Sequence, residues 1–242
     1  MDDLYAEIMG SRAGYGALRS SLGAVTERLA GDLPEADLLR RYEPRSEWFS
    51  REESRRGVHG IPHEARVLVL SEVLSRLEVL AGASLDQDVV RWSAVTHDLR
   101  RHGEGFDYQH GERSAAWVMD TDFGTNGTDK DAIAYCNFWH VPQDCEAPSI
   151  PPELRVLKDA DAVDRFRAQE IILNAEGFAK PPTMDDVFDH NFLRTNYAHL
   201  LVPVGRFFYR LSAYIKAKSR SNGELSGFDS VLEAGRVLGL VR

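Results

Sequence analysis

The chain has 242 residues, of which 43% are hydrophobic, 10% aromatic and 28% charged. This composition excludes a disordered or collagen-like chain, and the length supports one globular domain or one domain with an appendage. The formal net charge of -9 disfavours nucleic acid as a partner, because most of the surface would repel a phosphate backbone. A small anionic substrate held by a metal is compatible with this charge.

The cysteines and the apolar stretches of the sequence indicate in which cellular compartment the protein is located. Cys136 and Cys145 are too few for a disulfide framework and lack the CxxC spacing of metal or redox motifs. The first ten residues are acidic and do not resemble a secretory signal, and no stretch approaches the roughly 20 apolar residues that span a bilayer. We therefore expect a cytoplasmic protein without a membrane partner.

Apolar residues recur at steps of three and four along most of the chain, as in Val67, Leu70, Val73 and Leu74. This is the helical period, and alternating runs typical of strands are absent from the sequence, so we predict an all-α fold. Helices are predicted over residues 12–30, 63–82, 86–100, 109–120, 128–140, 152–170, 184–194, 198–219 and 228–239.

A charge-dense segment, EPRSEWFSREESRRG at 43–57, follows the first predicted helix. Such a segment has too little apolar content to contribute much to a core. It indicates an N-terminal helical extension over residues 1–55 and a main helical domain over residues 56–242.

Six of the eight histidines lie between residues 59 and 140. Neutral imidazole is the commonest metal-binding side chain, carboxylates often accompany it, and helical bundles build metal sites from facing helices. The pair His97 and Asp98 ends an apolar-periodic stretch, where both side chains can turn toward one ion. Such a pair by itself is more typical of a surface or a helix cap, so the surrounding motifs decide its interpretation.

Five motifs follow one another in the middle of the chain: HGIPHEARV at 59–67, THDLRR at 96–101, FDYQHGERSA at 106–115, WHVPQD at 139–144 and LKDADAVDRFR at 157–167. Their content and order resemble the HD-domain superfamily of metal-dependent phosphohydrolases. The segment at 192–204 is similar to the helix that usually follows, whereas residues 1–50 match no part of the family pattern. The resemblance implies an HD-domain helical bundle with an N-terminal helical extension.

The resemblance also implies the metal ligands, which are His63, His97, Asp98 and Asp161. Members with two metals add two histidines, at positions that match His110 and His140, and Asp98 then bridges the ions. In one-metal members the His110 position instead supports catalysis or the ligands, so one or two ions are both compatible with the sequence. A mixed set of histidine and carboxylate ligands accepts Mn, Fe, Co, Ni, Zn or Mg as the divalent metal.

Further roles follow from the same motifs. Catalysis is assigned to Asp98, His110, Arg66 and Arg101, and substrate binding to Lys158, Arg165 and His59. Guanidinium groups suit phosphate oxygens, although Arg66 and Arg165 could instead pair with buried aspartates. The alternative for His59 is a solvated position or one beside the ligands. Asp159 and Asp164 are expected to tolerate replacement by asparagine better than Asp161.

The activity implied by the resemblance is hydrolysis of a phosphate ester by a metal-activated water. The expected partner is a nucleotide or another small phosphorylated metabolite, whose identity the sequence leaves open, as it does the formation of a homo-oligomer. The alternative is a mixed-valent di-iron oxygenase, because members of the same superfamily with that activity use the same six-ligand pattern.

Overall fold

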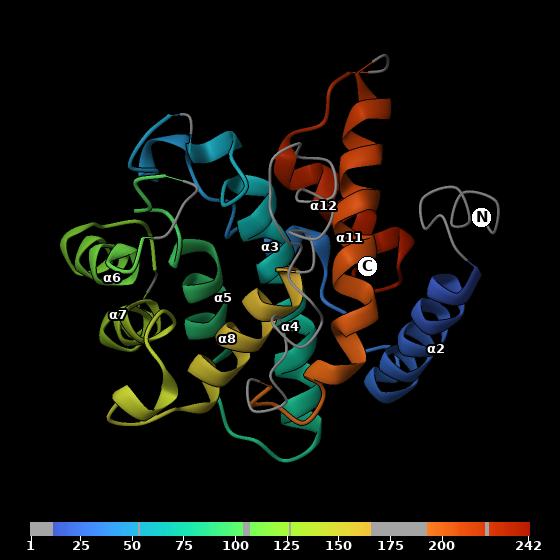
Figure 1. Cartoon of the computed structure of the whole chain (residues 1–242), viewed down its shortest axis with the longest axis horizontal. Coiled ribbons are helices and arrows are strands. Elements are labelled where there is room, and N and C mark those ends of the chain that lie inside the picture. Colours follow the sequence, from blue (N-terminus) through green and yellow to red (C-terminus); the bar gives the residue numbers. More distant parts are fainter. Residues whose placement is uncertain (1–11, 53, 104–106, 126, 166–192, 221–222) are drawn as a thin grey trace, which may run out of the picture.

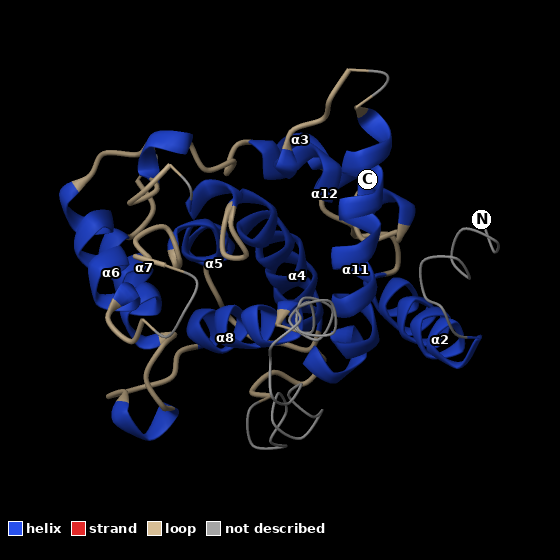
Figure 2. Ribbon diagram, turned by 45° about the horizontal axis from the view of Figure 1, so that its top comes forward, coloured by secondary structure: helices blue, strands red, loops and turns tan. Residues whose placement is uncertain are grey.

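The computed structural model describes residues 12–52, 54–103, 107–125, 127–165, 193–220 and 223–242. All regular secondary structure in these ranges is helical, which confirms the predicted all-α class (Figure 2). Within them, no helix is both long enough and apolar enough to cross a bilayer.

The α-helices are α2 (Arg12–Leu29), α3 (Ala36–Arg40), α4 (Ile61–Leu80), α5 (Gln87–Thr96), α6 (His110–Asp120), α7 (Lys130–Trp139), α8 (Pro152–Asp164), α11 (Ala198–Ser219) and α12 (Gly227–Val237). Short 3₁₀ helices are η1 (Ser46–Trp48), η2 (Ser54–Arg56) and η3 (Asp144–Glu146). Most predicted helices agree with these bounds to within a few residues.

The differences have local causes. The helix predicted over 86–100 ends at Thr96, because residues 97–100 form a turn. The helix predicted over 152–170 corresponds to α8, which ends at Asp164, and residues 166–170 lie outside the described residues. The helix predicted over 184–194 falls almost entirely outside them, and residues 193 and 194 are not helical. Helix α3 was not predicted, because five residues are too few to show a period.

Helix α4 is the centre of the fold, and it packs against α5, α8 and α12. Most of its side chains are buried, on nearly all sides of the helix, as expected for a helix that other helices surround. Helices α6 and α7 form a pair on one side of the molecule, and α2 packs against α11 on the other (Figure 1). This arrangement places the start of α4 and the ends of α5 and α8 in the interior.

Residues before the predicted boundary at 55 belong to the same buried core as α4. Leu18 on α2, Leu39 on α3 and Trp48 on η1 are all buried in that core. The backbone N–H of Ser50 donates to the carbonyl of Leu99 at 3.0 Å, so this segment also holds the turn after α5. The division into extension and main domain stays a prediction.

Helix α11 crosses α8 at Gly205, and this crossing yields a prediction about stability. A Cβ atom at residue 205 would lie 2.2 Å from the carbonyl oxygen of Val163. We expect Gly205→Ala to lower the free energy of unfolding by about 1 to 3 kcal/mol, because the helices must separate. Gly23→Ala on α2 is the control, since nothing lies within 4 Å of its added methyl group. Urea unfolding measures both, and equal stability of the two variants would contradict the prediction.

Candidate metal centre

The six side chains predicted to bind metal meet in the interior of the bundle. Five helices position them: His63 in the first turn of α4, His97 and Asp98 directly after α5, His110 at the start of α6, His140 directly after α7, and Asp161 in α8. Their exposed fractions range only from 0% to 6%. The fold therefore joins all six predicted ligands in one buried cluster.

The first part of this cluster surrounds Nε2 of His63. That atom lies 3.3 Å from His97 Nε2, 3.6 Å from Asp98 Oδ2 and 3.7 Å from Asp161 Oδ1. Metal bonds to histidine measure about 2.0 to 2.1 Å, so neighbouring ligands of one ion lie about 3 to 4 Å apart. These four side chains have the spacing that one divalent ion requires.

The second part surrounds the other oxygen of Asp98. Oδ1 lies 2.9 Å from His110 Nε2 and 3.6 Å from His140 Nε2, and the two Nε2 atoms are 3.0 Å apart. Asp98 therefore faces one pair of histidines with Oδ2 and the other pair with Oδ1. A carboxylate in this position can bridge two ions.

The histidine rings are oriented through their other nitrogen. In three of them Nδ1 donates to the backbone carbonyl three residues earlier: His97 to Ala94 at 3.0 Å, His140 to Asn137 at 2.6 Å, and His110 to Asp107. Nδ1 of His63 lies 2.8 Å from a carboxylate oxygen of Asp164. A carbonyl oxygen only accepts, so the proton of a neutral ring is on Nδ1 and Nε2 keeps its lone pair. The four Nε2 atoms thus face the centre as potential ligand atoms.

This arrangement of lone pairs tests whether a metal fits. With protons on Nδ1, the unprotonated Nε2 atoms of His110 and His140 face each other at 3.0 Å, which is repulsive without positive charge between them. Asp98 Oδ1 is buried and accepts no hydrogen bond of acceptable geometry from the residues that the structure describes. Imidazole nitrogen and carboxylate oxygen together suit divalent transition ions. The residues present therefore fit one or two such ions.

The charges in the cluster also favour binding of a divalent metal ion. Burial opposes protonation of His97, but nearby carboxylates, chiefly that of Glu64, raise its pKa to about 10. Burial and the neighbouring imidazoles lower the pKa of His140 to about 4, against the effect of Asp98. The carboxylates therefore attract positive charge strongly, while His140 stays neutral and able to bind a metal.

Gly111 allows the two histidines of the second part to approach. A Cβ atom at this position would lie 2.7 Å from the carbonyl oxygen of Asn137, which accepts the hydrogen bond from His140. The start of α6, with His110, thereby packs directly against the end of α7. The glycine after His110 in the sequence is the local feature that permits this contact.

Two of the predicted arginines lie beside the cluster. Nη1 of Arg101 is 3.3 Å from His110 Nε2 and 3.7 Å from Asp98 Oδ1. Nη2 of Arg165 is 2.6 Å from Asp161 Oδ2, and the Arg165 side chain is 59% exposed. Arg101 is close enough to act on a group bound at the centre, and Arg165 pairs with a predicted ligand.

The other two buried, positively charged side chains with predicted roles, Arg66 and Lys158, form ion pairs within the protein. Both Nε and Nη2 of Arg66 donate to the carboxylate of Asp164, at 2.6 and 3.1 Å, so Arg66 follows the alternative of a buried pair. The buried Lys158 donates to Asp144 Oδ1 and to the Pro142 carbonyl, each at 2.7 Å. The contacts of Lys158 do not involve the ligand cluster, whereas Asp164, the partner of Arg66, also contacts His63.

His59 lies beside the predicted ligand His63, which is one of the alternatives expected from the sequence. Its ring meets the ring of His63 edge-on, with 5.5 Å between the ring centroids. His59 is half-buried, whereas His63 is fully buried. The contact therefore places His59 at the boundary of the cluster.

Sequence reasoning missed two acidic side chains that support the histidines. Oε2 of the buried Glu64 lies 3.1 Å from His97 Nδ1, and burial raises the pKa of Glu64. Asp164 holds both His63 and Arg66. The position of Glu64 directly after the predicted ligand His63, just before the apolar residues of α4, was the available signal for it.

The contacts of the neighbouring aspartates revise the expectation that both tolerate replacement. Asp159 accepts hydrogen bonds from the backbone N–H groups of Arg194 and Thr195, at 2.8 and 2.7 Å, and so fixes the chain before α11. Asp164 is fully buried against a charged arginine. Asp159 and Asp164 each have a structural role. Of the three aspartates, Asp161 faces Nε2 of His63, whereas Asp164 contacts Nδ1 of the same ring.

For Asp164 this gives a second prediction about stability. Asp164→Asn is expected to lower the free energy of unfolding of the metal-free protein by about 3 kcal/mol, because the charge of Arg66 stays buried beside a neutral group. Asp161→Asn is the matched control, since its partner Arg165 is largely exposed. Urea unfolding with a chelator present measures both. Stability of Asp164→Asn equal to that of the unaltered protein would contradict the role of this pair.

Comparisons with known proteins supply no assignment. The chain matches no protein-family model, no curated protein and no solved structure. The resemblance to the HD-domain superfamily therefore stays a prediction. Any functional proposal depends on the geometry of the six buried side chains and on the two groups they form around Asp98.

Proposed function

We propose that the chain is a metal-dependent phosphohydrolase of the HD type, acting on a nucleotide or another small phosphorylated metabolite. The observation that supports it best is the position of Asp98 between two pairs of histidines whose Nε2 atoms all face the centre. One divalent ion would be held by His63, His97, Asp98 and Asp161, and a second by Asp98, His110 and His140.

A bound divalent ion supplies two kinds of chemistry, since it lowers the pKa of a coordinated water and polarises a phosphoryl oxygen. The side chains of the protein supply the rest. Arg101, beside Asp98 and His110, neutralises charge on the phosphoryl oxygens in the transition state. With a single ion present, His110 is free to donate a proton to the leaving group.

A mixed-valent di-iron oxygenase is the second candidate. Four histidines and two aspartates in two groups that share a carboxylate suit that function equally well. The guanidinium group of Arg101 beside the centre favours the hydrolase, because such a group matches phosphoryl oxygens. A cytoplasmic location and a small phosphorylated substrate belong to the same proposal.

Metal analysis and activity screening decide between the candidates. The protein is purified without added metal, its metals are measured, and a panel of phosphorylated metabolites is assayed with and without oxygen. Phosphate release that needs no oxygen and stops with a chelator supports the hydrolase. Two irons per chain with oxygen consumption supports the oxygenase instead. Metal-loaded protein that releases no phosphate from any compound contradicts the proposal.

A further inference from the structure

A second concentration of positive charge lies outside the metal centre, where the start of α4 meets α11 and α12. Two adjoining cavities of about 350 and 730 Å³ occupy this place, and Arg56, Pro62 and Lys216 line both of them. Together they form one cleft, which we call the α4–α11 cleft. Each cavity by itself has a volume within the range of small-molecule pockets, which measure about 300 to 1,000 Å³.

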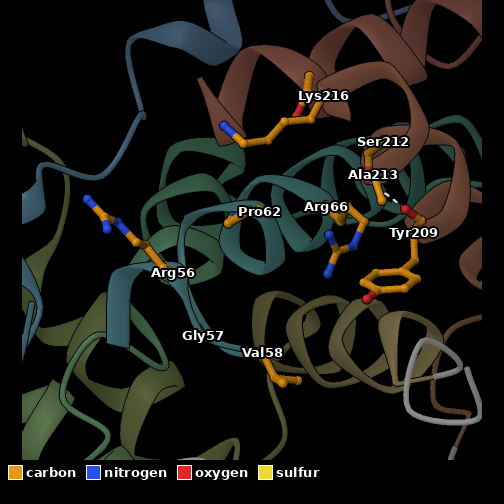
Figure 3. A pocket seen from close by; sticks show the side chains of 10 residues that line it. Arg56, Gly57, Val58, Pro62, Arg66, Tyr209, Ser212, Ala213 and Lys216 are labelled. Atoms are coloured by element: carbon orange, nitrogen blue, oxygen red, sulfur yellow. Dashed lines mark hydrogen bonds between the residues drawn. The ribbon is translucent and has the colours of Figure 1, made fainter. Parts of the chain in front are cut away.

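Side chains from η2, α4, α11 and α12 line the smaller cavity, which we call the inner cavity; the larger one is called the outer cavity. Figure 3 shows Arg56 from η2, Arg66 from α4 and Lys216 from α11 around Pro62, with the ring of Tyr209 beside Arg66. The outer cavity adds Arg55 and Arg220, with Glu224 as the acidic residue of its lining. Positive side chains therefore outnumber the negative one, in a protein whose net charge is -9.

The positively charged side chains of the cleft differ in whether they already form ion pairs or hydrogen bonds within the protein. Arg66 is committed to Asp164, and Nζ of Lys216 donates to the Leu225 carbonyl at 3.1 Å and lies 3.5 Å from Glu224. The side chains of Arg56 and Arg220 are exposed and make no ion pair or hydrogen bond with the residues that the structure describes. Two guanidinium groups thus remain available, and Lys216 lines both cavities.

We propose that the α4–α11 cleft binds a small phosphorylated molecule, with Arg56, Lys216 and Arg220 contacting its phosphate groups. Guanidinium forks match phosphate oxygens in pairs, and a local excess of positive charge on an acidic protein attracts anions selectively. Pro62, Ala213 and the ring of Tyr209 give the inner cavity an apolar wall for the carbon part of such a molecule.

This site is separate from the metal centre, although the two are neighbours. Arg66 lines the inner cavity and bonds to Asp164, and Asp164 in turn holds His63. The Arg66–Asp164 pair therefore forms the wall between them. The proposal does not rest on the hydrolase activity, because the cleft contains none of the six candidate metal ligands.

Calorimetric titration with inorganic pyrophosphate tests the site. The full-length protein is kept in a chelator, so that metal at the histidine cluster does not bind the probe. We expect one binding site, and Arg56→Ala with Arg220→Ala should weaken it by about tenfold or more, because charge-assisted hydrogen bonds are lost. Arg56→Lys with Arg220→Lys should keep most of the affinity. Arg19→Ala, an exposed arginine on α2 outside the cleft, should leave it unchanged.

Three outcomes would overturn the proposal. The unaltered protein binds no pyrophosphate at millimolar concentration, or the double alanine variant binds it as tightly as the unaltered protein. In the third, a short single-stranded oligonucleotide binds through the same two arginines more tightly than pyrophosphate, which makes the partner a nucleic acid. Circular dichroism checks that each variant is folded. If the double alanine variant is not folded, the single variants Arg56→Ala and Arg220→Ala provide the test, and each should weaken binding.

Discussion

Asp98→Ala is expected to abolish metal binding and activity while leaving helix content nearly unchanged. Asp98 faces both parts of the centre, with Oδ2 3.6 Å from His63 Nε2 and Oδ1 2.9 Å from His110 Nε2. Its removal leaves each group of histidines with an incomplete set of ligands. Because Asp98 follows α5 and is not part of a helix, the helices themselves lose no backbone contact.

Elemental analysis after dialysis measures the loss of metal, and circular dichroism measures helix content. His97→Ala should behave in the same way, because its Nε2 lies 3.3 Å from that of His63. Asp120→Asn is the matched control, since Asp120 is exposed at the end of α6. Full metal occupancy in both Asp98→Ala and His97→Ala would contradict the assignment of the centre.

The helices were largely predictable from the period of the apolar residues, whereas the ligand set was predicted from the resemblance of the motifs to the HD-domain superfamily. Apolar residues recur in α4 at steps of three and four, as at Val67, Leu70 and Leu74, and this period predicts a helix. The ligands lie at helix ends, where a polar side chain can turn inward without interrupting the apolar face. His97 after α5 and His140 after α7 are both in such positions.

The partners of the cations were not predictable from the sequence. Arg66 pairs with Asp164, which is 98 residues away in the chain, and Lys158 pairs with Asp144 on the segment of η3. No local period reports such pairs, because they depend on how the helices cross. For the same reason, the sequence motifs did not predict the α4–α11 cleft, whose lining includes both Arg56 and Arg220.

The number of metal ions is a separate question, and His140→Ala tests it. Nε2 of His140 lies 3.0 Å from His110 Nε2 and 3.6 Å from Asp98 Oδ1, whereas Asp161 faces His63 in the other group. His199→Ala is the control, because His199 is exposed on α11. Metal content and rate are measured for each variant under saturating metal.

In a two-ion centre, His140→Ala is expected to lose about one of two ions, because the other ion keeps its four ligands. In a one-ion centre the variant keeps its metal, and His110→Ala lowers the rate by about 10²- to 10⁴-fold through loss of a proton donor. We expect the first result, because Asp98 belongs to both groups and presents a different oxygen to each. Retention of both metal and rate by His140→Ala and His110→Ala would contradict a role for either histidine, while the group around His63 would keep its assignment.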